Sequence, residues 1–359
     1  MKNYVIGFYL EKLYYSPQFE PVIREIVKRN ISYVVIIPKN LDRDELNQRD
    51  ESIKYCQEKG FTYCVEEEEC ECNIMVFGNT PHPIHTHFKK SALIMHGVWG
   101  GKMVNYAPSL NNFDLRFLDG TFLETYLGEL FPEKKSIYYV SGYSKLDSYF
   151  LLTQEDRIKF LQHRHLDPNK KTILYAPTFY PSSILKMGKK FPEDLADYNI
   201  ILKPHSHLFL RKKYRKDLNR LKSWAQYPNV YLANFNETNI LPFLQAADLM
   251  ISDMSSAVFE FAGVGKPVII NMFLRYRLLH KLFPYKITKR LDTEHFYLWN
   301  VGDTPKNYQE MLVNTKENLT NPDKNKTNRE NIGHQVIGIV DGKVSERIVD
   351  KLMELNSQN

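Results

Sequence analysis

The sequence predicts an α/β protein with two lobes, each built on an open and mostly parallel β-sheet. Three observations lead to this fold class. The chain of 359 residues is too long for one ordinary hydrophobic core. Short apolar segments of strand length alternate with helical or loop segments. After a polar stretch at residues 162–171, the same alternation starts again, which indicates a second lobe.

The first lobe opens with a strand, a helix and a second strand. Residues 4–10 and 33–37 predict the strands, and residues 21–28 predict a helix with one apolar face. Four further strands are expected in the apolar segments at residues 74–77, 92–95, 115–118 and 137–140. The first domain is therefore placed at residues 1–150, with a sheet that is mostly parallel.

The second lobe repeats this pattern. Its strands are expected at residues 172–175, 199–202, 230–232, 249–252 and 268–270. They place the second domain at residues 170–330. Residues 315–331 are polar and predict a flexible connection. The helical spacing of Val344, Ile348 and Leu352 predicts a closing helix, placed at residues 343–359, that packs back on the first lobe.

The composition excludes several classes of protein. Hydrophobic residues make up 43% and charged residues 25% of the chain, and no apolar segment approaches the ~20 residues of a membrane-spanning helix. Segment 4–10 is interrupted by Glu11 and Lys12 without a cleavage site, so a secretory signal is not expected. We expect a cytoplasmic location, with peripheral contact to the inner face of the membrane left open.

The formal net charge of +6 suits anionic substrates, an anionic membrane surface or nucleic acid. The densest basic segment, residues 211–222, has leucines among its lysines and arginines. A solvated helix face is the favoured interpretation, and a peripheral membrane contact is the second. No nucleic-acid-binding motif accompanies the segment, so nucleic acid is not an expected partner.

No metal site is expected. The cysteines, Cys56, Cys64, Cys70 and Cys72, form no paired zinc pattern and are interpreted as reduced, non-catalytic thiols. Three histidines, His82, His85 and His87, lie in a proline-broken loop with no carboxylate at ligand spacing.

Polar motifs follow four of the predicted strands. They are His96-Gly97, Pro177-Thr178-Phe179, Pro204-His205 and the segment Asp253-Met254-Ser255-Ser256. Open α/β sheets bind ligands at the carboxyl ends of their strands, so two such lobes facing each other would surround one cleft with these motifs.

The last of these motifs is the most informative. Ser255 and Ser256 stand where a strand is followed by a helix, and their hydroxyls can donate to phosphate oxygens beside free backbone N–H groups. A diphosphate-carrying substrate would fit there. The alternative is that either serine only caps the helix.

With these residues in place, the chain resembles the CDP-glycerol glycerophosphotransferase family, the teichoic acid primases and polymerases. Six segments match the family in order and spacing: MHG at 95–97, GYSKLD at 142–147, ILYAPTF at 173–179, LKPHSHL at 202–208, AADLMISDMSSAVFEFAGVGKPVI at 246–269 and DGKVSERIV at 341–349. The resemblance covers about residues 90–350.

Three departures from the family pattern stand out. Where the family often has HGT, then proline and a nearby lysine, His96-Gly97 is followed here by Val98-Trp99-Gly100-Gly101-Lys102. Ser206 replaces the proline that usually follows the second histidine, and Met254 replaces an aromatic residue. Neither of the last two changes removes a group that would transfer a proton or bind phosphate, whereas the first leaves the acceptor open.

The resemblance implies a GT-B fold, with two Rossmann-like lobes facing each other across a cleft. It also implies a transferase that moves glycerol phosphate from CDP-glycerol to an acceptor hydroxyl, releases CMP and needs no cofactor. His96 is then the base candidate, and His205 would donate to the diphosphate or to the departing CMP.

The remaining site residues follow from the same resemblance. Ser255 and Ser256 are expected to bind the diphosphate. The other substrate-binding candidates are Gly97 beside the base, Thr178 at the nucleotide, Lys203 as a positive charge, Glu260 toward ribose hydroxyls and Asp253 as an orienting or capping carboxylate. A Lys203 that faces away from the ligand would be only a solvated side chain.

Other functions stay open at this stage. A GT-B glycosyltransferase or a nucleotide-sugar epimerase would share the two lobes and the diphosphate site, and a non-catalytic scaffold could keep the fold. The sequence does not choose between CDP-glycerol, CDP-ribitol and other CDP-polyols. The acceptor is expected to be a lipid-linked saccharide or a polymer end, in teichoic acid or capsule synthesis.

Overall fold

The computed structural model describes residues 2–39, 46–80, 86–133 and 136–358. By its internal contacts the chain divides into two compact units, and each is described by itself. The first comprises residues 1–98, 104–148 and 338–359, and the second comprises residues 99–103 and 149–337. The sequence prediction placed residues 99–103 in the first lobe, whereas their side chains pack within the second unit.

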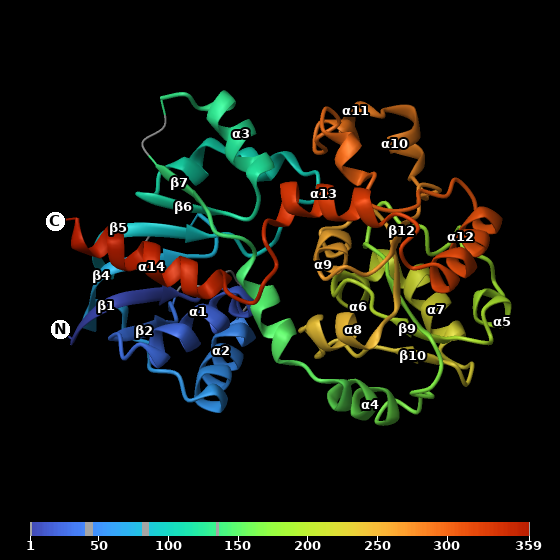
Figure 1. Ribbon diagram of the computed structural model, residues 1–359, viewed down its shortest axis with the longest axis horizontal. Coiled ribbons are helices and arrows are strands. Elements are labelled where there is room, and N and C mark those ends of the chain that lie inside the picture. Colours follow the sequence, from blue (N-terminus) through green and yellow to red (C-terminus); the bar gives the residue numbers. More distant parts are fainter. Residues whose placement is uncertain (1, 40–45, 81–85, 134–135, 359) are drawn as a thin grey trace. The chain divides into compact units, whose positions relative to one another are not determined.

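The first unit contains a seven-stranded parallel sheet with the order β3-β2-β1-β4-β5-β6-β7 (Figure 1). Its strands are β1 (Lys2–Tyr9), β2 (Tyr33–Ile36), β3 (Tyr63–Cys64), β4 (Cys70–Phe77), β5 (His87–Ile94), β6 (Leu115–Leu118) and β7 (Ile137–Val140). All six predicted strands are present, and only the two-residue β3 was not predicted. The strand order reverses between β1 and β4.

Four α-helices belong to the described part of this unit: α1 (Ser16–Lys28), α2 (Leu46–Lys59), α3 (Thr121–Leu130) and α14 (Val344–Ser357). Helix α1 begins at Ser16 rather than at Pro21, because a proline at the start of its first turn fits a helix N-terminus. Short 3-10 helices are η1 (Leu13–Tyr15), η3 (Glu67–Glu69), η4 (Met103–Tyr106), η5 (Pro108–Asn111) and η6 (Ser144–Leu151).

The core of the first unit lies between its sheet and helices from both ends of the chain. Helix α14 buries Ile348, Val349 and Leu352 completely or almost completely. These residues belong to the same apolar cluster as Ile6 on β1 and Ile74 on β4. The last helix in the sequence therefore completes a core that the first strand begins.

The second unit contains a five-stranded parallel sheet with the order β10-β9-β8-β11-β12. Its strands are β8 (Thr172–Ala176), β9 (Asn199–Leu202), β10 (Val230–Leu232), β11 (Leu249–Ser252) and β12 (Val268–Ile270), close to the predicted bounds. Here the strand order reverses between β8 and β11.

Helices surround this second sheet. They are α4 (Gln154–Gln162), α5 (Phe191–Asp194), α6 (His207–Leu210), α7 (Arg215–Trp224), α8 (Leu241–Ala246), α9 (Ala257–Gly263), α10 (Leu278–Leu282), α11 (Tyr285–Thr288), α12 (Tyr308–Thr320), α13 (Lys326–Ile337) and the 3-10 helices η7 (Lys212–Tyr214) and η8 (Phe296–Trp299). Fully buried Trp224 packs in the core with Ile251 of β11.

The prediction of a flexible connection at residues 315–331 was wrong, because α12 and α13 cover most of this segment. Three of its polar side chains, those of Thr315, Asn318 and Arg329, are buried and hydrogen-bonded. Thr315 donates to the carbonyl of Met311 at 2.8 Å, and the Arg329 guanidinium donates to the carbonyl of Gly265 at 3.1 Å. Polar composition therefore does not indicate disorder here, since the polar groups find partners inside the fold.

The cysteines are free thiols, and burial raises the pKa of Cys56 and of Cys72 to about 12. Such thiols stay protonated and unreactive at neutral pH. His82 and His85 lie outside the described residues. Among the residues that are described, no cluster of three histidine, cysteine or acidic side chains could hold a metal, and no helix has the length and apolar character to cross a bilayer.

Candidate functional site

Each sheet has one place where the strand order reverses, and the polar motifs of the sequence lie at or near these two places. In the first unit His96 follows β5, beside the carboxyl end of β4. In the second unit Thr178 follows β8 and Asp253 follows β11, the two strands at the reversal. Open α/β sheets bind ligands at such switch points.

The backbone fixes the tautomer of His96. Its Nδ1 lies 2.9 Å from the carbonyl oxygen of Gly78, which directly follows β4. A carbonyl oxygen can only accept a hydrogen bond, so Nδ1 carries the proton in this contact. In the neutral ring, Nε2 then keeps its lone pair and is able to accept a proton from a substrate hydroxyl.

Aromatic rings and one amide hold His96 in place. The imidazole stacks on Tyr15 with ring centroids 5.0 Å apart and 28° between the planes. Gln18 donates to the His96 carbonyl at 2.8 Å and to the Tyr143 hydroxyl at 2.6 Å. Tyr15 itself packs so closely on Gly78 that a Cβ there would lie 2.5 Å from its ring. No local pattern in the sequence predicts these contacts, because Tyr15 and Gln18 are distant from His96 along the chain.

Gly97 has open space beside it. No described atom lies within 4 Å of the position that a Cβ would take. Packing against the described residues therefore does not exclude a side chain at this position.

In the second unit Asp253 organises the loop that follows β8. It is fully buried, and one carboxylate oxygen accepts from the Thr178 N–H at 3.0 Å. The other accepts from the Ser183 N–H at 3.1 Å and from the Ser183 hydroxyl at 2.6 Å. Both oxygens therefore accept hydrogen bonds inside the unit, and Asp253 holds the loop after β8 in position.

Burial also changes the pKa of the Asp253 carboxyl group. Complete desolvation raises the pKa of Asp253 to about 6, although the hydrogen bonds from Ser183 and Thr178 favour the ionised form. The Thr178 hydroxyl donates to the carbonyl of Pro181 at 2.6 Å. This hydrogen bond within the loop after β8 stabilises the conformation of the loop.

Ser255 and Ser256 lie partly exposed before α9. Ser256 occupies the N-cap position, yet its hydroxyl does not cap the helix. The Ser255 hydroxyl is 3.4 Å from the Ala257 nitrogen, at the outer limit of a hydrogen bond. Capping therefore does not occupy the Ser256 hydroxyl, although α9 has only seven residues and adds a limited dipole field.

The short segment Trp99–Met103 packs next to Ser256 within the second unit. Trp99 is buried against Phe259 and Trp299, with ring centroids 5.5 and 6.0 Å away. A Cβ at Gly100 would lie 3.3 Å from the backbone nitrogen of Ser256, so only glycine allows this approach without a shift. This contact explains why residues 99–103 belong to the second unit.

The backbone fixes the opposite tautomer of His205. Its Nδ1 accepts a hydrogen bond from the N–H of His207 at 3.2 Å, and therefore carries no proton. In the neutral ring the proton is then on Nε2, which can donate to an anionic oxygen. The ring packs against Phe179 and His207, with centroid distances of 4.8 and 4.6 Å.

The surroundings of His205 are positively charged. Its pKa is lowered, first by burial and then by four basic neighbours, which are His207, Lys102, Lys203 and Arg211. Part of the His205 residue remains exposed, so solvent weakens the effect of these neighbouring charges. A lowered pKa keeps the imidazole neutral at neutral pH, and the surrounding cations favour an anionic ligand.

Two further candidates occupy different settings. Lys203 is partly buried, with its ammonium 5.4 Å from the centre of the Phe243 ring, and it contributes to the charge around His205. Glu260 is only 5% exposed on α9. Contact between Glu260 and a ribose would therefore have to occur in a confined space.

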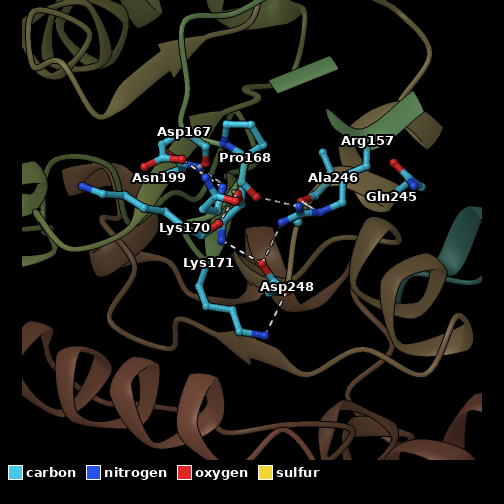
Figure 2. A network of polar contacts seen from close by, with 12 residues as sticks. Arg157, Asp167, Pro168, Lys170, Lys171, Asn199, Gln245, Ala246 and Asp248 are labelled. Carbon is cyan, nitrogen blue, oxygen red and sulfur yellow. Dashed lines mark hydrogen bonds and ion pairs between the residues drawn. The ribbon is translucent and has the colours of Figure 1, made fainter. Parts of the chain in front are cut away.

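A polar pocket of about 550 Å³ lies at the opposite edge of the second sheet, where β8 and β11 begin. Arg157 lines this pocket, and Figure 2 shows it donating to the carbonyls of Ala246 and Pro168 and to the Asp248 carboxylate, over distances of 3.1 to 3.3 Å. Asp248 also accepts from Lys171 at 3.3 Å. These bonds join the loops at the amino ends of the strands, so the pocket is interpreted as a structural brace.

Comparisons with known proteins agree with the resemblance of the motifs. The family described as CDP-Glycerol:Poly(glycerophosphate) glycerophosphotransferase matches residues 103–354. A teichoic acid poly(ribitol-phosphate) polymerase of Bacillus spizizenii is 27% identical over 198 residues, which are 52% of this chain and 28% of that protein. A teichoic acid glycerol-phosphate primase of Bacillus subtilis (strain 168) is 29% identical over 149 residues, covering 40% of this chain and 38% of the primase. The chain thus matches well under half the length of these relatives.

Solved structures show the same fold over almost the whole chain. The wall teichoic acid polymerase TagF superposes with a TM-score of 0.63 at 17% identity, over 99% of this chain and 89% of the TagF chain. A TagF variant soaked with CDPG gives a TM-score of 0.62 at 15% identity, with the same coverage. A UDP-N-acetylglucosamine 2-epimerase gives 0.56 at 13% identity, over 100% of this chain and 97% of the epimerase. At these identities the likeness shows a GT-B type fold and no more.

Proposed function

Because the chain belongs to the CDP-glycerol:poly(glycerophosphate) glycerophosphotransferase family, we propose that it transfers a polyol-phosphate group from a CDP-polyol to an acceptor hydroxyl. Glycerol phosphate from CDP-glycerol is the first candidate, and CMP is the second product. The observation that supports this proposal most is the opposite tautomers that the backbone imposes on His96 and His205.

In the proposed reaction, the acceptor hydroxyl gives its proton to Nε2 of His96 as its oxygen attacks the phosphorus that bears the polyol. The bond between this phosphorus and the oxygen that bridges to CMP breaks, and CMP leaves with that electron pair. Positioned proton transfer by histidine typically contributes about 10²- to 10⁴-fold to a rate.

His205 stabilises the negative charge that develops on the departing CMP. Nε2–H of His205 donates to the diphosphate in the substrate and to the CMP phosphate as it departs. Ser255 and Ser256 donate to the same diphosphate, and Lys203 adds positive charge. Asp253 acts indirectly, by holding the loop that contains Thr178.

The acceptor and the location are proposed from the relatives. Their names specify polymerases and primases of teichoic acid, so a lipid-linked saccharide or a polymer end is the proposed acceptor. The TagF structure soaked with CDPG supports a CDP-activated donor. We place the reaction in the cytoplasm, at the inner face of the membrane.

One experiment tests the activity. The purified chain is incubated with CDP-glycerol or CDP-ribitol and with lipid-linked or oligomeric acceptors, and CMP release and product mass are followed. Acceptor-dependent CMP release supports the proposal. Release of a nucleoside diphosphate from a nucleotide sugar would instead indicate glycosyl transfer, and turnover of such a sugar without an acceptor would indicate an epimerase.

A second experiment tests the serines. We expect the double change Ser255→Ala and Ser256→Ala to weaken CDP-glycerol binding about tenfold, since each lost hydrogen bond to a charged phosphate is worth about 1.5–3 kcal/mol, part of which water replaces. Calorimetry with CDP-glycerol measures the affinity. The matched control is Ser223→Ala, because the Ser223 hydroxyl only donates to its own helix at Arg220. Equal affinity in the double variant and the wild type would reduce both serines to structural residues.

A further inference from the structure

One large aromatic side chain beside the proposed base is left largely uncovered. Tyr14 is 46% exposed, whereas its neighbour Tyr15 is 2% exposed and belongs to the core. The Tyr14 ring meets the His96 imidazole edge-on, with centroids 5.0 Å apart and 69° between the planes. Tyrosine rings carry much of the energy of binding interfaces, so an exposed ring at this place indicates contact with a ligand.

The topology of the first sheet explains the position of Tyr14. Strand β1 ends at Tyr9, and the chain continues into η1 (Leu13–Tyr15), beside the point where the strand order reverses between β1 and β4. Open α/β sheets bind ligands at such a switch point. His96 follows β5 and contacts Gly78 after β4, so the exposed ring and the base belong to the same edge of one unit.

The Tyr14 ring is held on a fixed support. It packs edge-on against Tyr15, with centroids 4.8 Å apart and 87° between the planes. Burial, and then the neighbouring Tyr14 and Glu11, raise the pKa of Tyr15, and a hydrogen bond between the two tyrosine side chains contributes to this shift. Tyr15 in turn packs tightly on Gly78. A ring that is fixed before binding loses little conformational entropy when a ligand stacks on it.

The charge near Tyr14 distinguishes two kinds of acceptor. The loop at residues 10–15 contains one acid, Glu11, and one base, Lys12, so it has no net charge. A phosphodiester chain end calls for an excess of positive charge, as is found around His205. A neutral sugar ring does not, and its C–H groups pack on the electron-rich face of an aromatic ring. The surroundings of Tyr14 therefore favour a sugar.

We propose that Tyr14 stacks on a sugar ring of the acceptor and thereby selects a saccharide over an open-chain polyol-phosphate end. The inference rests on the proposed function, in which the acceptor hydroxyl gives its proton to His96. The 5.0 Å between the two ring centres brings a sugar on Tyr14 within reach of the imidazole. The half-buried Asn79 and the exposed Thr80, which follow β4, offer an amide and a hydroxyl to the hydroxyl groups of the sugar.

Binding of acceptor analogues tests the inference without turnover. The full chain is titrated with methyl glycosides of several disaccharides and with a short glycerol phosphate oligomer, and ligand signals are followed by nuclear magnetic resonance. We expect a glycoside to bind more tightly than the oligomer. Tyr14→Ala should weaken glycoside binding about five- to tenfold. Tyr14→Leu, which keeps apolar bulk without the aromatic face, should weaken it nearly as much, and Tyr14→Phe should bind like the wild type.

Kinetics with saturating CDP-glycerol separates recognition from chemistry. Tyr14→Ala should raise the KM for the glycoside by the same factor as the binding constant and change kcat much less, because His96 remains in place. The matched control is Tyr285→Ala, which removes a tyrosine that is 60% exposed in the second unit. This control should bind and extend the glycoside like the wild type.

The outcomes distinguish this inference from the proposed function. Glycoside binding that is equal in Tyr14→Ala and the wild type, or equally weakened in the Tyr285 control, would overturn the role of Tyr14. So would a wild type that binds and extends only the oligomer, although its CMP release would leave the transferase activity standing. Glycoside binding that depends on the Tyr14 ring, in a chain that releases no CMP with any acceptor, would support the sugar site and contradict the transferase.

Discussion

The backbone engages Nδ1 of both His96 and His205, but in opposite hydrogen-bonding roles. The contact with the Gly78 carbonyl leaves Nε2 of His96 as an acceptor, whereas the N–H of His207 leaves Nε2 of His205 as a donor. The residue type alone would suit either role. The assignment of base and donor therefore rests on two backbone groups that no motif in the sequence reveals.

His96→Ala should lower kcat about 10²- to 10⁴-fold, because the acceptor loses its base. CDP-glycerol affinity should stay near that of the wild type, because the donor is proposed to bind the second unit. Initial rates of CMP release and calorimetry measure the two quantities. Gln18→Ala, which removes the hydrogen bonds to the His96 carbonyl and the Tyr143 hydroxyl but leaves the imidazole, should lower kcat less. An alanine variant at His96 with ordinary turnover would contradict the assignment.

Asp253 links stability to pH. Its pKa is raised from 3.8 to about 6 in the folded chain, so folding favours the protonated form. The stability contribution of this group is complete below pH 3.8 and is lost as the pH rises through about 6, an amount of about 3 kcal/mol.

The change Asp253→Asn removes that titration. The difference in unfolding free energy between wild type and variant should therefore shift against the wild type as the pH rises from 4 to 7. Urea unfolding at several pH values measures it, and comparison with the variant cancels the other titrating groups. A difference that stays constant over this range would show that Asp253 does not titrate with a raised pKa.

The candidate site could be predicted from sequence only at its motif residues. His96, Thr178, His205 and Ser256 stand directly after strands, so their positions at the sheet edges follow from local pattern. A supporting residue such as Ser183 approaches Asp253 only in the folded chain, so no local sequence pattern identifies it. Asp253 was recognised as a motif residue, but its full burial depends on packing that the sequence does not display.

At the scale of elements, the segment Trp99–Met103 connects the serine motif to a buried aromatic cluster. Trp99→Ala should lower the free energy of unfolding of the second unit by about 3–5 kcal/mol, because a large buried ring is removed. It should also weaken CDP-glycerol binding, since Gly100 would no longer be held against Ser256. Chemical unfolding and calorimetry test both effects. Trp99→Phe should lose less of each, and unchanged binding in the alanine variant would show that the segment does not support the serines.

The strands were predicted better than the helices. Apolar segments in a parallel sheet are buried on both faces, so their sequences stand out, as for β6 and β9. Helices α12 and α13 were missed because Thr315, Asn318 and Arg329 are buried polar residues. Thr315 bonds within its own helix and Arg329 bonds to the distant Gly265 carbonyl, and hydrophobic periodicity shows neither contact.

Two of the family-matching segments contact each other and not a ligand. Asp147, the last residue of GYSKLD, accepts from the N–H groups of Val344 and Ser345 at 3.1 and 2.6 Å. These two residues begin α14 and belong to the matching segment at 341–349. The resemblance at these positions therefore reflects how the last helix is attached to the first unit.

At the scale of the whole molecule, the two units have separate cores and different chromophores. All three tryptophans, Trp99, Trp224 and Trp299, belong to the second unit. Leu352→Ala should destabilise the first unit by about 2–5 kcal/mol, and Leu221→Ala should do the same to the second.

Two optical signals distinguish these effects. Tryptophan fluorescence should shift its unfolding midpoint in the Leu221 variant and stay near that of the wild type in the Leu352 variant. Circular dichroism, which reports on both units, should shift in each variant. Equal shifts of the fluorescence midpoint would show that the two units unfold as one.

The contribution of α14 to the first core has a consequence for biosynthesis. The ribosome completes the whole second unit before it translates residues 344–357, so the part of the first core that α14 covers stays exposed until then. During that interval the growing polypeptide exposes apolar surface, and chaperones that bind such surface would protect the chain from aggregation.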